Sequence, residues 1–316
     1  MLHALVSDDS SLVVACSGGP DSTAALLAVV RAHRGPVTAA TFDHEMREGS
    51  EADVAMVHRV ACDLGVQVIE GRAASTLRGE AAARTARYRW LARACWNVGA
   101  NVCITGHTRD DQAETVLLRL ARGSGARGVA GMSSDAPWPV AAPSGPALRL
   151  LRPLLEVARV EVEIYLTALG VEAVRDPSND SLAYARNQVR HQVLPALVEV
   201  NAQARAHLAS FADRQREDDS ALTVWARAWL DKHATVSQDA LALPRKRLVA
   251  LPLAVERRVL AEAGERLGVR LGEAHLRGLG GLVRGPGGAD LAVPGGTAEV
   301  RGTVLGLRRM PHRSAH

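Results

Sequence analysis

Residues 12–22 read LVVACSGGPDS, and this stretch decides the fold. An apolar run leads into two glycines and a proline, and an Ala/Leu/Val-rich run, residues 23–30, follows. This order predicts a buried strand, a tight turn and the first turn of a helix. The first amides of a helix have no partner within it, and its dipole favours negative charge there. The turn is therefore suited to binding phosphate.

The glycine turn carries an acid instead of a lysine. Gly18 and Gly19 have no Cβ, so the backbone can approach a ligand closely. The phosphate loop of many ATPases ends in Gly-Lys-Ser/Thr, whereas here Asp21 takes the place of the lysine. An acid beside phosphates predicts a magnesium-mediated contact. The alternative is an ordinary strand-to-helix turn in which Ser and Asp cap the helix.

Strand and helix patterns alternate through the first half of the chain. Further strands are predicted at residues 37–43, 66–70 and 101–105, and helices at residues 51–64 and 79–96 lie between them. This alternation predicts an α/β fold with a Rossmann-like parallel sheet and helices on both faces. Ligands of such sheets bind beyond the carboxyl ends of the strands. Asp21, His44 and His107 each follow a predicted strand, so we expect them to converge.

The second half has a different pattern. Residues 135–146 are rich in Pro and Gly and predict a loop, and residues 157–169 predict a helix. Residues 196–232 predict one long helix with a polar face. The boundaries that we predict are a catalytic domain at 1–195, a linker helix at 196–239 and a small, mostly helical C-terminal domain at 240–316. Within the last domain we expect helices at 254–267 and 272–282. The Gly-rich residues 285–306 predict turns and short strands, such as one at 291–293.

Composition limits the function classes. Of 316 residues, 47% are hydrophobic, which is enough for a buried core. No apolar run approaches the roughly 18 residues of a membrane span, and the N-terminus has no secretory pattern, so we expect a cytoplasmic protein without a membrane partner. The four cysteines form no Cys-x-x-Cys pair, which argues against zinc or an iron–sulfur cluster and favours buried thiols. They are Cys16, Cys62, Cys95 and Cys103.

Arginine supplies nearly all of the positive charge. Of 38 basic residues, only Lys232 and Lys246 are lysines, so no lysine nucleophile or base lies in the first 231 residues. Arginine is left to bind phosphate and carboxylate in a fork geometry. The net charge of +4 is compatible with a nucleic-acid partner but does not demonstrate one.

A second polar block, residues 105–115, reads TGHTRDDQAET and opens a predicted helix. Asp111 and Glu114 are three residues apart and share a face near its N-terminus. Two such carboxylates could hold a magnesium ion or an ammonium group. The alternative is that they complement the helix dipole, which is worth about 0.3–1 kcal/mol. His107 has its own alternative, a histidine hydrogen-bonded at a strand end.

Three arginine pairs also suit anions, although solvated arginine faces are common. They are Arg84 with Arg87, Arg119 with Arg122, and Arg186 with Arg190.

Taken together, these motifs resemble the tRNA(Ile)-lysidine synthetase family of PP-loop ATP pyrophosphatases. The resemblance covers roughly residues 10–195, with the motifs in the family order. The glycine turn is shared by PP-loop enzymes, and the later motifs are more specific to lysidine formation. The motifs are SGGPDS at residues 17–22, HTRDDQAET at 107–115, RGSG at 122–125, RPL at 152–154, DPSN at 176–179, RN at 186–187 and RH at 190–191.

The resemblance implies a two-step reaction. ATP adenylates the C2 carbonyl oxygen of the wobble cytidine in an isoleucine tRNA with a CAU anticodon, and pyrophosphate is released. The side-chain amine of free L-lysine then displaces AMP. The tRNA changes from reading AUG to reading AUA.

The resemblance also implies roles for individual residues. Asp21 and Asp111 would hold Mg²⁺, and Asp111 and Glu114 would take Mg²⁺ or the lysine ammonium. Arg87 and Arg190 would contact the lysine carboxylate or the developing phosphate charge. Arg122 matches a position near the tRNA or the adenylate. ATP would contact Ser17, Gly18, Gly19, Pro20, Asp21 and Ser22, with His107 bordering the nucleotide.

The chain departs from the family pattern in three places. Thr108 stands where the family often has a second histidine, and the histidine-rich segment is reduced to residues 43–47, DHEMR. The C-terminal region has room for one tRNA-binding domain where family members often carry two. Its basic residues are Arg245, Lys246, Arg247, Arg257 and Arg258. The sequence leaves a homodimer open.

Three other functions compete with this interpretation. A PP-loop tRNA thiolase would draw on paired cysteines, which the chain lacks. An amidating ligase would need a glutaminase domain or partner. A nucleotide-binding regulatory module without turnover would have no need of Asp111 and Glu114 beside Arg87 and Arg190.

Overall fold

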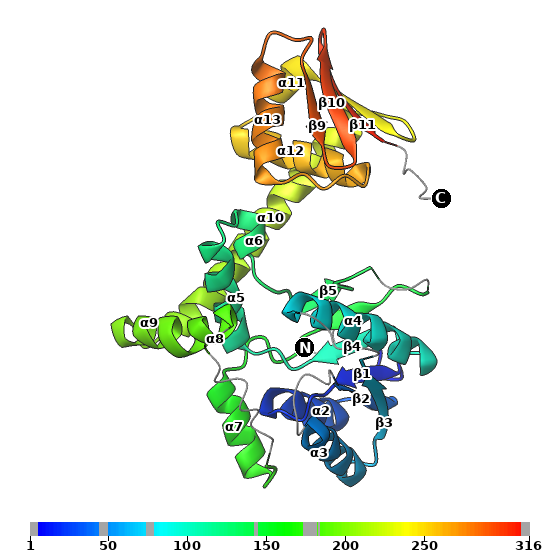
Figure 1. Ribbon diagram of the computed structural model, residues 1–316, viewed down its shortest axis with the longest axis vertical. Coiled ribbons are helices and arrows are strands. Elements are labelled where there is room, and N and C mark those ends of the chain that lie inside the picture. The colour runs from blue at the N-terminus through cyan, green and yellow to red at the C-terminus, as the bar shows by residue number, and fades with distance from the viewer. Residues whose placement is uncertain are drawn as a thin grey trace. The chain divides into compact units, whose positions relative to one another are not determined.

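The computed structural model describes residues 6–43, 50–73, 79–141, 145–172, 182 and 184–310. Residues 44–47 of the shortened histidine segment and the motif at 176–179 lie outside these ranges. The chain divides into two compact units, Met1–Arg214 and Gln215–His316, each with its own core (Figure 1).

Unit 1 contains a six-stranded sheet in the order β3-β2-β1-β4-β6-β5. All neighbouring strands pair in parallel except β5, which runs antiparallel to β6. The side chains of Leu12, Val13 and Val14 are fully buried, because helices cover both faces of the sheet. The strands are β1 (Leu12–Ala15), β2 (Val37–Asp43), β3 (Gln67–Arg72), β4 (Val102–Thr105), β5 (Asp135–Pro137) and β6 (Arg149–Leu151).

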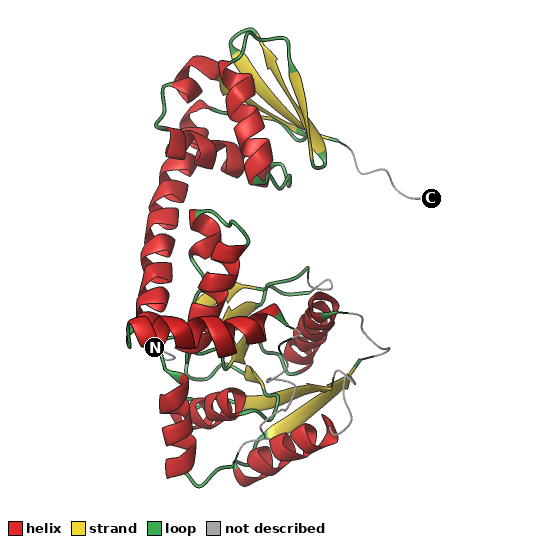
Figure 2. Ribbon diagram, turned by 60° about the vertical axis from the view of Figure 1, so that its left-hand side comes forward, coloured by secondary structure: helices red, strands yellow, loops and turns green. Residues whose placement is uncertain are grey.

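Helices pack on the two faces of this sheet, as alternation along β1 requires (Figure 2). Leu12 and Val14 face the cluster formed with α2 (Pro20–Ala32), α3 (Ser50–Asp63) and α7 (Arg159–Ala168). Val13 points to the opposite face, where α4 (Glu80–Asn97) packs. The predicted α/β fold with helices on both faces is confirmed.

The strand order places a switch point between β1 and β4. The chain first builds outward from β1 to β2 and β3, and then returns to the other side of β1 with β4. In sheets of this kind, ligands bind at such a point, beyond the carboxyl ends of the two central strands. The glycine turn follows β1 and the His107 block follows β4, so this edge receives both motifs.

A set of shorter helices completes unit 1. Ala113 of α5 packs with Val189 and Leu194 in a small buried cluster, which fixes the segment around residues 186–190 against α5. The elements are α5 (Arg109–Ala121), α6 (Ala126–Val129), α8 (Ala185–Gln188), a π-helical turn η2 (Val189–Val193), α9 (Leu194–Val200) and the start of α10 (Ala204–His233).

Two predictions about this region are wrong in part. Residues 135–146 are not all loop, because β5 pairs with β6 across Asp135–Pro137. Residues 196–232 form two helices with a break at 201–203. At that break the Asn201 side chain accepts a hydrogen bond from the amide of Gln203 (2.9 Å) and so competes with the helical pattern.

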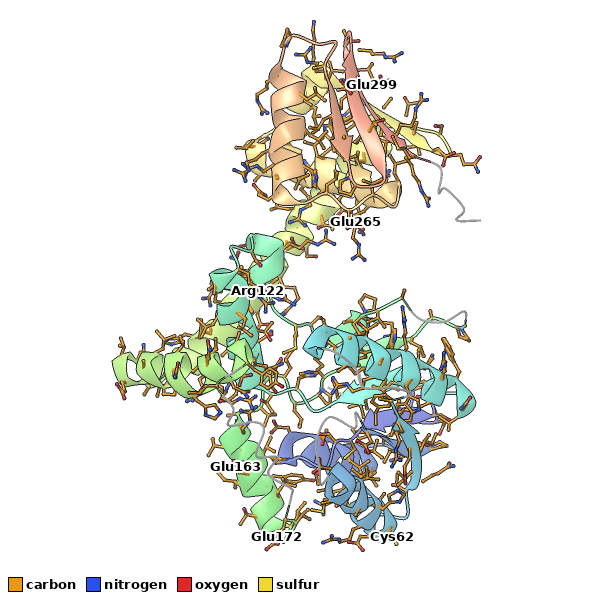
Figure 3. The ribbon with its side chains drawn as sticks, in the orientation of Figure 1. Cys62, Arg122, Glu163, Glu172, Glu265 and Glu299 are labelled. Atoms are coloured by element: carbon orange, nitrogen blue, oxygen red, sulfur yellow. The ribbon has the colours of Figure 1, made fainter. Side chains whose placement is uncertain are left out.

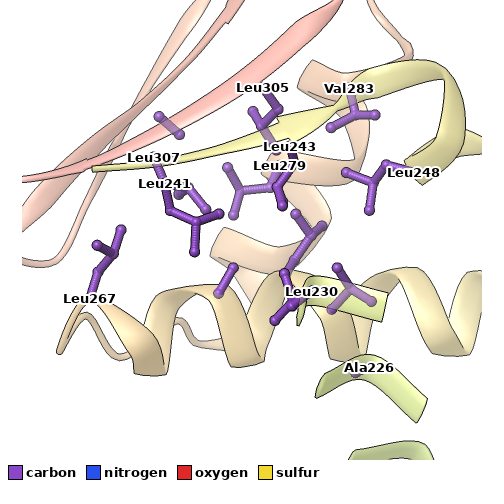
Figure 4. Packing of buried hydrophobic residues seen from close by; sticks show 14 of the residues in the cluster. Ala226, Leu230, Leu241, Leu243, Leu248, Leu267, Leu279, Val283, Leu305 and Leu307 are labelled. Carbon is purple, nitrogen blue, oxygen red and sulfur yellow. The ribbon is translucent and has the colours of Figure 1, made fainter. Parts of the chain in front are cut away.

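Unit 2 packs three helices and the end of α10 against a five-stranded antiparallel sheet, ordered β7-β8-β11-β10-β9. Alternate residues such as Leu241, Leu243, Leu305 and Leu307 form its core with Leu230 of α10 (Figure 4). The predicted strand at 291–293 lies within β9, and β10 lies within the region 285–306 for which turns and short strands were predicted. β7 and β8 were not predicted. The elements are β7 (Thr235–Val236), β8 (Ala240–Pro244), α11 (Arg245–Val249), α12 (Leu253–Arg266), α13 (Glu273–Arg284), β9 (Asp290–Val293), β10 (Gly296–Arg301) and β11 (Val304–Arg309).

The cysteine prediction needs one correction. Cys16, Cys95 and Cys103 are buried, whereas Cys62 is exposed near the end of α3 (Figure 3). Its position next to the helix end, at the solvent face, outweighs the apolar character of its neighbours in sequence. Within the ranges that the structure describes, no helix has both the length and the apolar character needed to cross a bilayer.

Candidate active site

The glycine turn after β1 is held by serine hydrogen bonds. The amide of Ser17 donates to Ser22 Oγ (3.0 Å), and this hydroxyl donates to the carbonyl oxygen of Gly19 (3.0 Å). Gly19 is the N-cap of α2 and offers no side-chain acceptor, and Pro20 occupies the first turn. The first amides of α2 are thus free of a capping side chain and can bind an anion.

Gly18 is required by its backbone. Its φ of +80° lies in the left-handed region that L side chains rarely adopt. A Cβ at this position would also stand 2.7 Å from the backbone oxygen of Asp53. Glycine therefore meets two independent demands here, one of conformation and one of space.

The two loops at the switch point touch each other. Gly106, between β4 and α5, lies so close to the first turn of α2 that a Cβ would stand 2.4 Å from the backbone oxygen of Asp21. This close approach brings the start of α5 beside the start of α2. Two motifs that are about ninety residues apart in sequence therefore share one edge of the sheet.

Asp111 has one carboxylate oxygen for its helix and one for its surroundings. Its Oδ2 accepts hydrogen bonds from the Thr108 amide (2.8 Å) and from the Thr108 hydroxyl (2.9 Å). The Asp111 amide in turn donates to Thr108 Oγ1 (3.4 Å), and this bond together with the one from the Thr108 amide forms a capping box. Its Oδ1 faces three arginines. Thr108, which replaces the second histidine of the family pattern, thus acts as the cap that orients Asp111.

Three arginines and three carboxylates form one network, which we call the ion-pair cluster. It consists of Asp21, Asp111, Glu114, Arg159, Arg186 and Arg190. The carboxylate of Glu114 is fully buried and receives Arg186 Nε on Oε2 (2.7 Å) and Arg190 Nε on Oε1 (2.6 Å). Arg186 and Arg190 also reach Asp111 Oδ1, at 2.9 and 3.4 Å.

Arg159 joins this network to the glycine turn. Its Nε lies 3.3 Å from Asp21 Oδ2 and its Nη2 lies 3.2 Å from Asp111 Oδ1. Its Nη1 lies 3.7 Å from Glu114 Oε1. A single guanidinium therefore contacts all three acids.

Burial and charge act in opposite directions on the carboxyls. Burial raises the pKa of Asp21 to about 6, although Arg159 partly opposes the rise. Burial would also raise the pKa of Asp111, but Arg186 and Arg159 outweigh it and lower the value to about 2. Asp111 is thus ionised at every physiological pH, whereas the pKa of Asp21 lies close to physiological pH.

His107 borders the cluster and is neutral. Burial lowers its pKa to about 3, with nearby Asp111 opposing and Arg152, Arg186 and Arg87 adding to the fall. One ring nitrogen, Nδ1, lies 2.9 Å from the Thr105 hydroxyl. The ring can therefore exchange hydrogen bonds with a ligand without bringing charge.

Comparisons with known proteins show to which family the chain belongs. The family model for the PP-loop domain matches residues 2–197. A tRNA(Ile)-lysidine synthase of Salinispora tropica is 42% identical in an alignment that covers 95% of this chain and 91% of that protein. The chain belongs to the tRNA(Ile)-lysidine synthase family. Members from Salinispora arenicola (41% identical, covering 93% of this chain and 89% of that protein) and Streptomyces coelicolor (39%, covering 84% and 74%) are also similar.

Structural similarity extends to other PP-loop proteins. A U34-tRNA thiolase from Methanococcus maripaludis has a TM-score of 0.54 at 14% identity, covering 66% of this chain and 72% of that one. At this identity the likeness concerns the fold alone. Together with the PP-loop match, it agrees with the predicted ATP-binding α/β architecture.

The predicted site residues fall into two groups, those in or beside the ion-pair cluster and those outside it. Asp111, Glu114 and Arg190 lie in the ion-pair cluster, and Asp21 joins it through Arg159. Residues 17–22 form the turn beside the cluster, and His107 borders it. Arg186, which the sequence offered in an arginine pair and in the RN motif but without a role of its own, is in direct contact with both acids of α5.

Arg87 and Arg122 lie outside the cluster. The Arg87 guanidinium lies 5.3 Å from the ring centroid of Tyr88, on α4, and its charge contributes to the lowered pKa of His107. Arg122 caps the C-terminal end of α5, the end away from Asp111 (Figure 3). His44 is outside the described residues.

Sequence reasoning missed Arg159. It stands at the first position of α7, where a cation opposes the helix dipole, and this was the one signal that could have found it. Its backbone amide donates to Asp110 Oδ2 (2.8 Å), which fixes the start of α7 beside the start of α5. The unfavourable placement on its own helix is offset by three carboxylates from two others.

The residues fit a divalent cation at the junction of the two motifs. Asp21 Oδ1 is buried without a hydrogen-bond partner in the part of the chain that the structure describes. Such an atom is a ready ligand for a hard cation, and Asp111 reaches the same guanidinium as Asp21. Among the described residues, no three metal-ligating side chains are already grouped around one point.

Asp21 should make the stability of the apo protein fall with rising pH. The pKa of its carboxyl rises from 3.8 unfolded to about 6 folded, so the folded state favours the protonated form. The contribution is fully present below the unfolded value and is lost as pH rises through the folded one. At roughly 1.4 kcal/mol per unit, the loss is about 2–3 kcal/mol.

Denaturant unfolding of the wild type and Asp21→Asn from about pH 4 to about pH 7 measures this. We expect the wild type to lose stability relative to the variant over that interval. Parallel pH dependences for the two proteins would show that Asp21 titrates normally.

Proposed function

We propose that this protein ligates free L-lysine to C2 of the wobble cytidine of a CAU-anticodon isoleucine tRNA, using ATP and releasing pyrophosphate and AMP. The relatives' names give the tRNA class and the lysidine product. The observation that carries the proposal is the position of Arg159, which touches Asp21 beside the phosphate-binding turn and Asp111 and Glu114 on α5. The groups suited to ATP and the groups suited to an amine thus adjoin one another.

In the first step, the free amides at the start of α2 would bind the ATP phosphates. The O2 atom of cytidine attacks the α-phosphorus, a bond to O2 forms, and pyrophosphate leaves. The arginines of the ion-pair cluster are near enough to the turn to stabilise the negative charge that develops. His107, neutral and beside Asp111, would border the nucleotide.

In the second step, the amine of lysine attacks C2, and AMP leaves with the former O2 oxygen. Asp111 and Glu114 would bind the ammonium group and orient the amine toward C2, and the protons that the nitrogen loses would pass to solvent. In the apo protein both acids are neutralised by arginines. The cluster holds three acids and three guanidiniums. A phosphate anion and an ammonium group can therefore enter together without changing its net charge. An arginine would then shift to the phosphate and leave a carboxylate free for the amine.

Mg²⁺ is proposed as a cofactor, with Asp21 and Asp111 as its protein ligands. When bound, it would neutralise phosphate charge and favour departure of pyrophosphate. Asp21 Oδ1, buried and unpartnered among the described residues, supports this assignment.

We also propose that the C-terminal region, residues 240–316, contacts the tRNA, with 1–195 as the catalytic domain and 196–239 as the linker. Lys246 and Arg247 are exposed and available for phosphate. Arg258 is buried against Asp219, and Arg245 donates to the carbonyls of Val283 and Gly285, so both stabilise the unit itself.

The test mixes purified protein with ATP, labelled lysine and an isoleucine tRNA transcript with a CAU anticodon. We expect label in the RNA together with release of AMP and pyrophosphate. A transcript with uridine at the wobble position is the matched control and should take up no label. Leaving out lysine should still allow pyrophosphate release, because adenylation comes first.

The rival functions predict different outcomes. A thiolase would transfer sulfur and leave lysine free. A regulatory module would bind ATP without consuming it. Either result, with an intact tRNA and a folded protein, would overturn the proposal.

A further inference from the structure

A second group of arginines lies near His107 and outside the ion-pair cluster. We call it the Tyr88 group, and it consists of Tyr88, Arg84 and Arg87 of α4 and Arg152, which follows β6. The guanidinium carbons of Arg84 and Arg87 lie 4.9 and 5.3 Å from the centroid of the buried Tyr88 ring. Arg152 is 5% exposed, and its charge interacts with Tyr88 and Arg84.

The Tyr88 group lacks the acids that balance the ion-pair cluster. Among the residues that the structure describes, no carboxylate forms an ion pair with Arg84, Arg87 or Arg152. The Nε atoms of Arg87 and Arg152 are buried and have no hydrogen-bond partner there. Arg152 is held in place by one bond from Nη1 to the carbonyl oxygen of Ser133 (2.6 Å), which supplies no charge.

This arrangement is costly without a ligand. A buried donor left unsatisfied destabilises the folded state, and a charged donor does so more strongly. Burial, followed by the charges of Arg84 and Arg119, lowers the pKa of Arg152, while Tyr88 opposes this effect. The guanidiniums thus repel one another in a site from which water is partly excluded, and an oxyanion would satisfy both donors and the charge.

We propose that the Tyr88 group is an anion subsite that binds a phosphodiester of the substrate RNA close to the reacting nucleotide. The proposal rests on the function proposed above only in that the substrate is RNA. The subsite lies near the carboxyl edge of the sheet, because α4 starts there and Arg152 follows the end of β6. Arg87 and Arg152 both lie within electrostatic reach of His107, which borders the ion-pair cluster.

A strand of phosphodiesters fits the group better than the carboxylate of an amino acid. A single carboxylate is satisfied by one arginine fork, whereas the group offers three guanidiniums. Here the arginines are graded from buried Arg152 through half-buried Arg87 to exposed Arg84. This gradient of burial suits an RNA strand that passes from solvent into the site with a negative charge on each nucleotide. Arginine and tyrosine are common phosphate ligands.

The test is the binding of an anticodon stem-loop RNA, without ATP or lysine, as a function of salt. The variants are Arg84→Gln and Arg152→Gln. The matched control is Arg93→Gln, since Arg93 is an exposed arginine of the same helix, nine residues from Arg84 and therefore on its opposite face. A labelled RNA and fluorescence anisotropy give Kd at each KCl concentration.

We expect both variants to weaken RNA binding by roughly fivefold or more at low salt. Each should also reduce the slope of log Kd against log[KCl] by about 0.7–0.9, the value for one lost phosphate contact. Arg93→Gln should leave Kd and slope unchanged. Arg152→Lys, which keeps the charge, should restore most of the slope, and this separates a binding role from a structural one.

Three outcomes would overturn the proposal. An unchanged RNA affinity with a raised KM for lysine would assign the subsite to the amino-acid carboxylate. An equal loss with Arg93→Gln would mean diffuse surface charge. Arg84 is exposed, and thermal unfolding can verify that the Arg84→Gln variant is folded. An unchanged RNA affinity of this variant would mean that the group binds no RNA. Because turnover is not needed, a wild type that binds as expected but transfers no lysine would contradict the proposed function alone.

Discussion

Replacing Asp111 with asparagine should lower lysine transfer to tRNA by about two to three orders of magnitude, the usual effect of removing one charged contact to a reacting group. The amide keeps the size of the carboxylate and can still accept the hydrogen bond from the Thr108 amide, so the cap of α5 is largely retained. Its neutral side chain would leave Arg159, Arg186 and Arg190 with one acid fewer. Label incorporation from lysine under saturating ATP measures the loss.

The stability of this variant must be measured with its activity. Breaking a buried ion pair by removing one partner costs up to about 3–5 kcal/mol, and less here because the arginines are partly exposed. Asp110→Asn is the matched control in the same turn of α5. Asp110 pairs with Arg205 of α10 (3.0 Å) and contacts neither Arg186 nor Arg190, and an asparagine there can still accept the hydrogen bond from the Arg159 amide. Near-normal lysine transfer by folded Asp111→Asn would remove Asp111 from the proposed chemistry.

The same variant separates two roles for Asp111. If it holds the lysine ammonium, pyrophosphate release in the absence of lysine should continue. If it holds Mg²⁺, both steps should fall together.

Replacing Gly18 with alanine should abolish ATP use, with a loss of at least about a hundredfold. Alanine at φ +80° costs about 1–2 kcal/mol in backbone strain, and its Cβ would stand 2.7 Å from a backbone oxygen that cannot move without shifting α3. The turn would therefore move away from the phosphates. Lysine-independent release of pyrophosphate from ATP measures the effect.

Gly19→Ala is the control in the same turn. Gly19 has an ordinary φ of −73°, and an added Cβ would meet only the Ser17 hydroxyl, at 3.7 Å. This variant should keep the unfolding free energy of the wild type, whereas Gly18→Ala should have a lower one. Equal stability of the two proteins would show that the conformation of Gly18 does not hold the turn in place.

The sequence predicted much of the first unit. The expected strand at residues 37–43 matches β2, and the strands at 66–70 and 101–105 match β3 and β4 to within two residues. These elements have strong local signals, because a central parallel strand is apolar on both faces and short turns bound it. β5 and β6 are three residues each and are stabilised by pairing with each other, so no local pattern announced them.

The sequence predicted the motifs of the site but not the ion pairs that join them. The glycine turn and the pair Asp111 and Glu114 follow from spacing alone, because consecutive residues of a turn or helix face have fixed relative positions. Arg159 could not be assigned in this way, since its partners lie on α2 and α5. The same is true of Arg152, whose neighbours come from α4 and from the segment before β5.

The sequence by itself determined the PP-loop architecture, the anion-binding turn with its acid, and the two carboxylates at the start of α5, since each depends on backbone geometry within a few residues. Only the tertiary structure decided which arginines neutralise those acids and which remain without one. The physical reason is that a guanidinium on a long side chain can reach several neighbours, and the choice among them depends on how the helices pack around the switch point between β1 and β4.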